Sequence, residues 1–362
     1  MAVLLAYDQD PERWRRRFER GEALDETPYG YERAQGDAEL VWATSSAESA
    51  FARRVRHRMA GFLGFDLVHA WRNRRLLFDA DVVWTHTERE HLAVALLQLL
   101  RPPRRRVRVL AQSVWLWDTW ERWGRFRRGF VALLLKTHAI EVVHSRRNLA
   151  ASRSSVEGRR VELLPFGSAG LAPGGTQDGP GENVDVIAVG NDIDRDWSVL
   201  AEAARLLPDV RFRIVSRSGK AKAQEWPENA LCREADSMEE LARVYAATKV
   251  VVLPLRPNLH ASGATSCIEA MASGAVVVAT AVGGIEDYLG SFGQTVPAGD
   301  PEALARAVEA GMAGAIPPAP RDAVQRRGLT QGDYVARYVR VTHWIVGGAP
   351  WDPRVSDFAP LT

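Results

Sequence analysis

The chain has almost no cysteine and no long hydrophobic run. Of its 362 residues only Cys232 and Cys267 are cysteines, and neither has Cys or His companions at the spacing of a metal site. A disulfide-stapled fold and a zinc site are therefore not expected. The longest apolar stretches, 92–100 and 130–135, are much shorter than the roughly 20 residues that a bilayer-crossing helix needs. The first residues lack a basic leader and read as a strand, so we expect a cytoplasmic protein, with a peripheral contact at the inner face of the membrane left open.

Composition and charge indicate a folded protein with two unlike halves. Apolar residues make up 46% and charged residues 25%, which excludes a disordered chain, and 362 residues favour two domains. Residues 1–170 hold 29 Lys and Arg against 21 Asp and Glu, a net charge of +8, whereas the remainder of the chain is at −6. A basic half suits an anionic acceptor, a lipid surface or nucleic acid, with a solvated Arg-rich surface as the alternative.

The pattern of short apolar runs predicts two α/β domains. A Gly- and Pro-rich segment at 171–183 reads as a linker between an N-terminal domain, 1–170, and a C-terminal domain, 184–330. The last residues, 331–362, include an apolar-rich stretch that we expect to pack back on the N-terminal domain. Strands are expected at 3–6, 39–42, 67–70, 82–85, 108–112, 140–144, 161–164, 184–189, 211–216, 250–253, 276–279 and 295–297. Helices are expected at 197–207, 238–247, 265–272 and 301–310.

Runs such as VVVLPL and AVVVAT are apolar on both faces, which is typical of parallel strands covered by helices on both sides. Each half is then a Rossmann-like βαβ domain. Ligands of such sheets bind beyond the carboxyl ends of the strands, so the residues that follow each strand are the candidates for a site.

The helix after the VVVLPL strand carries the most specific pattern. It begins at a turn of small residues where free amides and the positive end of the helix dipole favour a diphosphate: Ser262, Gly263, Ala264 and Thr265. Glu269 lies one helical turn beyond Thr265, where its carboxylate can accept hydrogen bonds from two ribose hydroxyls. An ordinary capped helix and a surface Glu paired with a base are the alternatives.

This stretch resembles a known family. The residues IEAMASGAVVVATAVGG are similar to the signature LEAMASGVPVVATDVGG of the large retaining GT-B family called glycosyltransferase family 4, and the resemblance covers residues 184–312. It implies two Rossmann-like domains with parallel sheets facing a central cleft. It also implies a nucleotide diphosphate-sugar donor, UDP- or GDP-sugar, and a small-molecule, glycan or lipid acceptor. Transfer would retain the anomeric configuration, with no metal and no other cofactor.

The resemblance also identifies donor-binding residues, with one departure in charge. Gly190 and Asn191 occupy the loop after the first strand of the C-terminal domain, where the family usually has Gly, Arg and a Lys about five residues later. Arg195 is the nearest cation here. We expect Arg195 and two cations after the next strand, Arg217 and Lys220, to balance the charge on the leaving diphosphate. Asp192 and Asp194 have the spacing of a metal motif but stand where the family has its cations, and are taken as loop residues.

A second departure concerns the reacting centre. The family commonly has two Glu residues eight positions apart, and the position eight before Glu269 is Ala261. The loss of that carboxylate keeps two alternatives open. One is an epimerase or pseudo-glycosyltransferase of the same fold; the other is a non-catalytic subunit that binds a nucleotide-sugar.

In the first half, His86 follows the strand at 82–85, where family members often have a His near the donor sugar and the acceptor. A core polar His is the alternative, and HTEREH is not the HExxH zinc motif. Asp8, Tyr29 and Tyr31 follow the first strand and are expected to shape the acceptor site, although the family's Gly-rich turn is missing there.

Arg and Trp alternate between residues 101 and 128, in RPPRRRVR and WLWDTWERWGRFRR. Contact with an anionic lipid surface uses such a mixture. A charged helix that packs its Trp residues inward is the alternative, and no nucleic-acid-binding module is recognised.

Overall fold

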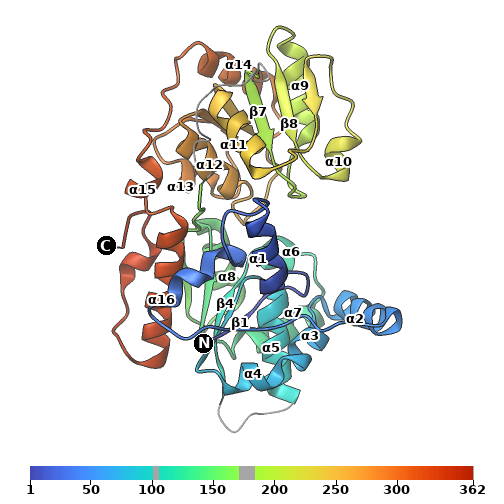
Figure 1. Cartoon of the computed structure of the whole chain (residues 1–362), viewed down its shortest axis with the longest axis vertical. Helices are drawn as coiled ribbons and strands as arrows, with labels where there is room; N and C mark the ends of the chain where they lie inside the picture. The colour runs from blue at the N-terminus through green and yellow to red at the C-terminus, as the bar shows by residue number, and fades with distance from the viewer. Residues whose placement is uncertain (101–105, 171–183, 362) are drawn as a thin grey trace.

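The computed structural model describes residues 1–100, 106–170 and 184–361, so the expected linker lies outside the described residues. Two α/β domains lie end to end in Figure 1, each built on a six-stranded sheet that is parallel throughout. The predicted fold class, two Rossmann-like domains with parallel sheets, is confirmed. None of the described helices is long and apolar enough to cross a membrane.

The N-terminal sheet has the strand order β2-β1-β3-β4-β5-β6. Its strands are β1 (Ala2–Leu4), β2 (Val41–Trp42), β3 (Val82–Thr85), β4 (Arg108–Gln112), β5 (Ile140–Val143) and β6 (Val161–Leu163). The helices of this domain are α1 (Pro11–Glu19), η1 (Pro28–Ala34), α2 (Ala50–Leu63), α3 (Leu67–Arg72), α4 (Arg74–Asp79), α5 (Glu88–Leu100), α6 (Leu116–Trp120), α7 (Arg125–Leu135) and α8 (Arg146–Ser155).

The C-terminal sheet has the order β12-β11-β10-β7-β8-β9. Its strands are β7 (Val186–Val189), β8 (Phe212–Val215), β9 (Ala230–Cys232), β10 (Val250–Leu253), β11 (Val276–Thr280) and β12 (Gln294–Val296). The helices are α9 (Trp197–Leu206), α10 (Gly219–Lys222), α11 (Met238–Ala247), α12 (Ala264–Ser273), α13 (Ile285–Leu289), α14 (Pro301–Met312) and α15 (Ala323–Arg326), followed by α16 (Gln331–Val346) and η2 (Pro353–Ser356).

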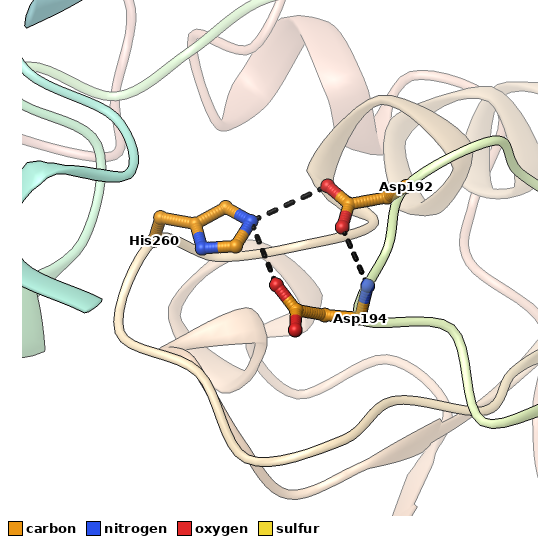
Figure 2. Close-up of side chains that lie close together, drawn as sticks. All are labelled: Asp192, Asp194 and His260. Carbon is orange, nitrogen blue, oxygen red and sulfur yellow. Dashed lines mark hydrogen bonds and ion pairs between the residues drawn. The ribbon is translucent and has the colours of Figure 1, made fainter. Parts of the chain in front are cut away.

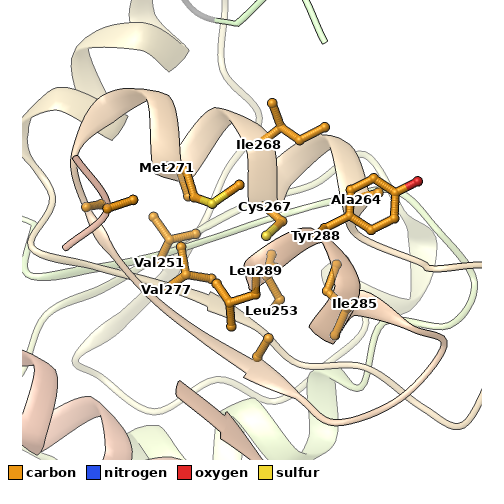
Figure 3. Packing of buried hydrophobic residues seen from close by; sticks show 14 of the residues in the cluster. Val251, Leu253, Ala264, Cys267, Ile268, Met271, Val277, Ile285, Tyr288 and Leu289 are labelled. Carbon is orange, nitrogen blue, oxygen red and sulfur yellow. The ribbon is translucent and has the colours of Figure 1, made fainter. Parts of the chain in front are cut away.

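Helix α12 is fixed against the sheet by an apolar layer. Figure 3 shows Cys267 and Met271 of α12 facing Val251 and Val277 of the central strands, and all four side chains are buried. Burial of each such aliphatic side chain contributes about 1.5–3 kcal/mol. The start of α12 is therefore held rigidly at the carboxyl edge of the sheet.

Helix α16 returns to the N-terminal domain and covers one face of its sheet, as its position in Figure 1 illustrates. Tyr334 and Tyr338 of α16 are fully buried there, and Trp84 Nε1 of β3 donates to Thr342 Oγ1 at 2.7 Å. The chain thus passes between the domains twice, first between β6 and β7 and again before α16.

Two expectations for secondary structure were wrong. Residues 67–70 form the helix α3 instead of a strand, because Asp66 caps the helix by accepting from the backbone N of His69. A four-residue apolar run does not distinguish the two conformations. The edge strand β9 was not predicted, since only one of its three residues is fully buried.

Candidate functional site

The loops after β7 and β10 meet at the centre of the C-terminal sheet. From β7 the sheet continues through β8 and β9 on one side, and from β10 through β11 and β12 on the other, so the connections diverge here. Such a switch point leaves a crevice at the carboxyl ends of the strands. The two loops are tied by the backbone amide of Asp196, which donates to Pro254 O, and by that of Arg256, which donates to Asp194 O, both at 2.8 Å.

The turn before α12 presents some free amides, but fewer than predicted. Gly263 is the N-cap in the left-handed conformation, with a φ of 85°, and no side chain caps the helix. The amide of Ser262 donates to Asn258 Oδ1 and that of Ala264 to Ala261 O. Within the described residues, the amides of Gly263, Thr265 and Ser266 have no acceptor. Three amides are therefore available to an anion, and Ser262 and Ala264 contribute by shaping the turn rather than by their amides.

Arg195 lies between the two loops with its guanidinium against the start of α12. A Cβ on Gly190 would be 2.1 Å from Arg195 Nε, and one on Gly263 would be 2.6 Å from Nη1, so both glycines make room for the side chain. Nη2 donates to Ser266 Oγ at 3.3 Å. Nε and Nη1 are buried and have no hydrogen-bond partner among the described residues, and the same holds for Ser262 Oγ. Since buried donors without partners are costly, this group is suited to an oxyanion ligand.

Glu269 is buried one turn further along α12. Its Oε2 accepts from the hydroxyl of Tyr245 at 3.1 Å. Burial raises the pKa of Glu269 to about 7, against the opposing effects of the Tyr245 hydrogen bond and the charge of Arg195. The alternative of a surface Glu paired with a base does not hold. Glu269 is buried, whereas Thr265, one turn earlier at the start of α12, is exposed.

The remaining donor-side candidates lie at the rim. Asn191 Oδ1 accepts from the backbone N of Arg217 at 2.6 Å and so ties the β7 loop to the β8 loop. Arg217 and Lys220 are exposed, and neither forms an ion pair within the described ranges. Lys220 is near enough to Asp194 to lower the pKa of that carboxyl, although burial raises it overall.

A cluster of carboxylates surrounds His260, the residue just before Ala261. His260 Nδ1 is 2.8 Å from Asp118 Oδ2, and Nε2 is 3.3 Å from Asp192 Oδ2 and 3.8 Å from Asp194 Oδ2. Figure 2 shows the imidazole facing the two C-terminal-domain carboxylates. Burial works to lower the pKa of His260, but the hydrogen bonds of Asp118 and Asp192 raise it to about 9. The ring is thus a cation at neutral pH.

Asp192, Asp194 and His260 are also the group within the described residues whose ligand atoms are close enough for a metal ion. A metal would need the unprotonated His260 Nε2, and the surrounding carboxylates instead favour the proton. The charge of the imidazolium is offset by the carboxylates around it, so the cluster ties α6 and the β7 loop to the residue before Ala261 and adds no net positive charge.

The N-terminal domain holds the turn from the other side. Asp118 of α6 accepts from the backbone N of Leu259 at 2.6 Å, and Ser145 Oγ donates to Leu259 O. Tyr288 of α13 donates to His144 O at 2.8 Å. The loop that leads into α12 is consequently a contact between the domains as well as part of the candidate site.

His86 lies in a buried network rather than beside Arg195. Its Nδ1 is 3.2 Å from the Tyr31 hydroxyl and 3.3 Å from Gln112 Nε2, and its ring stacks on Tyr29 with 3.2 Å between centroids. Burial lowers the pKa of His86 well below its usual value, so the imidazole is neutral. These contacts agree with the core polar alternative for His86.

The predicted acceptor residues differ in their exposure to solvent. Asp8 is exposed at the end of β1, and the Tyr29 hydroxyl lies 2.8 Å from Gln9 Nε2. Tyr31 is 0% exposed, and its hydroxyl contacts His86 and Tyr334. Tyr31 therefore does not line the cleft in this conformation and supports His86 instead.

A cavity of about 320 Å³ opens on the N-terminal side, between the end of α2 and helices α5, α6 and α7. Leu92, Leu116 and Val131 form part of an apolar wall, and Glu88 and Arg89 supply polar groups. Trp115 lines the cavity, and its ring centroid is 6.0 Å from that of His260. The cavity thus adjoins the carboxylate cluster.

Comparison with known proteins agrees with this geometry. Residues 184–313 match the family model described as glycosyl transferases group 1. The match lies within the C-terminal domain. The family resemblance deduced from the sequence is confirmed for this domain, and a comparison with curated proteins finds no match.

Solved structures similar to the chain extend the likeness to both domains. A sucrose-phosphate synthase from Thermosynechococcus elongatus is 17% identical with a TM-score of 0.62, and the match covers 95% of this chain and 96% of that one. A glycosyltransferase from Rickettsia africae is 13% identical with a TM-score of 0.60 over 96% and 98%. Anabaena HepE in complex with UDP-glucose is 12% identical, also at 0.60, over 96% and 97%. The fold is therefore GT-B.

The sequence did not single out Asp118 and His260 as a pair. They lie 142 residues apart and meet only because α6 packs against the β10 loop. The one signal available was that His260 directly precedes the turn of small residues.

Proposed function

We propose that this protein is a retaining glycosyltransferase that moves a sugar from a nucleotide diphosphate-sugar to an acceptor hydroxyl without a metal ion. The group 1 C-terminal domain and the GT-B fold support sugar transfer in general. The retaining, metal-independent mechanism and the residue roles are part of the proposal.

The observation that carries the proposal is the convergence of unsatisfied donors at the start of α12. In the part of the chain that the structure describes, Arg195 Nε and Nη1 and Ser262 Oγ are buried without partners, next to the free amides of Gly263, Thr265 and Ser266. A diphosphate would accept from these groups, and the charge of Arg195 and the helix dipole would be compensated by the ligand.

In the proposed reaction the bond between the anomeric carbon and the diphosphate oxygen breaks, and the acceptor oxygen bonds to that carbon on the same face. The acceptor proton passes to a leaving phosphate oxygen, so no protein nucleophile is required. Arg195 and the α12 amides stabilise the charge that develops on the diphosphate. Contacts such as Asp118 with Leu259 hold the domains together and limit access of water.

The donor is proposed to be a UDP- or GDP-sugar. Structures of HepE hold UDP and UDP-glucose, and this chain shares the fold of HepE at 11–12% identity. Glu269 would accept from the ribose hydroxyls in place of Tyr245. The acceptor is proposed to enter the cavity beside Trp115, whose apolar wall suits a natural product, a glycan with an aglycone or a lipid-linked sugar.

Thermal denaturation with UDP, GDP, TDP and ADP tests the proposal. A ligand at 100 times its dissociation constant stabilises the folded state by about 2.7 kcal/mol. We expect one of these nucleotides to raise the melting temperature of the wild type. The response should be lost in Arg195→Gln and reduced in Glu269→Ala, and kept in the control Arg306→Gln, which alters an exposed Arg of α14.

The unliganded Arg195→Gln protein should melt no lower than the wild type, because the substitution removes a buried charge with unpaired donors. Absence of any nucleotide response in the wild type, or an equal response in Arg195→Gln, contradicts the donor site. Turnover then separates the alternatives. Transfer to an acceptor supports the proposal, isomerised donor indicates an epimerase, and binding without turnover indicates a partner subunit.

A further inference from the structure

Helix α2 turns an arginine toward its own domain and most of its large apolar side chains outward. Its two buried residues are Arg56 and Ala60. The Arg56 guanidinium pairs with Glu48 and Asp66, at 3.1 and 2.7 Å, and lies 3.8 Å above the ring of Tyr7. The helix is thus attached to the domain through an ion-pair network. Most of its large apolar side chains are left on the outer face.

Those side chains form one outward stripe. Phe51, Val55, Met59 and Phe62 follow one another at helical spacing, and all four are exposed. Phe51 is 73% and Phe62 86% exposed, although a Phe that packs on its own domain would be mostly covered. In Figure 1 α2 projects from the side of the N-terminal domain.

Cations accompany the stripe. Arg53, Arg54 and Arg58 are exposed and form no ion pair within the described part of the chain, and α2 contains no Asp or Glu. Together with His57 they line an open hollow of about 400 Å³. An apolar stripe flanked by unpaired Arg side chains is the arrangement of a helix that lies in the headgroup region of an anionic bilayer.

Helix α7 extends the surface. Phe126 is 83% exposed, and Phe130 and Leu133 follow it at helical spacing and are also exposed. The two helices touch where Arg127 of α7 packs over Gly64, the C-cap of α2. Trp117 and Trp120 of the neighbouring segment do not contribute, since both are buried.

We infer that α2 and the exposed face of α7 dock this protein on a membrane that contains anionic phospholipid. A second copy of the chain fits this surface poorly, because a symmetric contact would set the Arg side chains of one α2 against those of the other. The inference does not depend on the proposed transferase activity, since it needs only the outer face of the N-terminal domain.

Flotation with phosphatidylcholine vesicles, with and without phosphatidylglycerol, tests the inference. We expect the wild type to float with the anionic vesicles, and salt to weaken the association. The double variant Phe51→Ser/Phe62→Ser should lower the partition coefficient at least about tenfold, since it removes two inserting rings. Arg54→Glu/Arg58→Glu should lower it roughly tenfold or more for anionic vesicles.

Matched controls come from exposed positions of the other domain. Leu206→Ser, on α9, and Arg243→Glu/Arg306→Glu, on α11 and α14, should float like the wild type. All variants should keep the wild-type melting temperature, because the altered side chains are exposed. The inference is overturned if the wild type ignores anionic vesicles or if the α2 variants float as the controls do. It is also overturned if light scattering shows a wild-type dimer that Phe51→Ser/Phe62→Ser dissociates.

Discussion

The sequence predicted Arg195 as a site residue but not the position of its guanidinium. The sequence identified it as the nearest cation to the expected diphosphate, because the family's usual Arg position holds Asn191. That its guanidinium fits between Gly190 and Gly263 depends on the two loops meeting in space. The expected charge of the diphosphate indicated that a cation is needed here. Only the structure shows that Gly190 and Gly263 leave room for its side chain.

Glu269 leads to a prediction about pH. Burial raises its pKa from 4.5 to about 7, so the folded protein keeps a proton that the unfolded chain has already lost. Its contribution to stability is present below pH 4.5 and is lost as the pH rises to about 7. At pH 8 we expect Glu269→Gln to exceed the wild type in free energy of unfolding by up to about 3 kcal/mol, and at pH 4.5 to differ little.

Urea denaturation at the two pH values measures this difference. Nucleotide affinity should move the opposite way, because only the ionised carboxylate accepts from two ribose hydroxyls, so binding to the wild type should strengthen as the pH rises through 7. A Glu269→Gln protein with the same pH dependence of stability as the wild type would contradict the assignment.

The helix α12 depends on two left-handed glycines, one at each end. Gly263 has a φ of 85° and Gly274 a φ of 79°. A Cβ on Gly274 meets nothing within 4 Å, whereas one on Gly263 would displace the Arg195 guanidinium. Substituting each glycine in turn therefore separates the cost of backbone strain from the loss of the Arg195 site.

We expect Gly263→Ala and Gly274→Ala each to lower the free energy of unfolding by about 1–2 kcal/mol, the cost of a left-handed Ala. The two proteins should nevertheless differ in ligand binding. Gly263→Ala should lose most of the thermal shift given by the nucleotide that stabilises the wild type, and Gly274→Ala should keep it. Equal shifts in the two variants would show that the Arg195 position does not matter for binding.

Most strands of the two sheets and four helices of the C-terminal domain were predictable because their apolar patterns are regular or well capped. β4, β10 and α11 begin and end at the predicted residues, and Ser237 caps α11 as its position suggests. No bounds were predicted for the helices of the N-terminal domain, and the remaining failures were short. β9 has three residues at an edge, and α3 begins from an Asp66 cap followed by an apolar run that also suits a strand. Local sequence decides such segments only weakly, and packing against neighbours decides the rest.

The two domains are joined by contacts that no local pattern reveals. Asp118 holds Leu259 and His260, and Arg146 and Arg147 face Asp287 and Glu286. The exposed Arg pairs contribute little each. The His260 contact is different, because the ring is buried and shared between carboxylates of both domains. The same residue thus connects domain association to the loop that leads into α12.

His260 should therefore make the stability of the whole molecule depend on alkaline pH. Its folded pKa of about 9 exceeds the usual 6.5, so the proton stays bound after the unfolded chain has released it. The stabilisation is complete below pH 6.5 and is lost as the pH rises through 9. Between these values the wild type should lose roughly 2–3 kcal/mol of unfolding free energy relative to His260→Gln.

Urea denaturation at pH 6.5 and 9.5 measures that loss, with His57→Gln, an exposed His of α2, as the control that should follow the wild type. Asp118→Asn should lie between the wild type and His260→Gln, because it removes one carboxylate and leaves Asp192 in place. If His260→Gln and His57→Gln show the same pH dependence, the ring is not held as a cation between the domains.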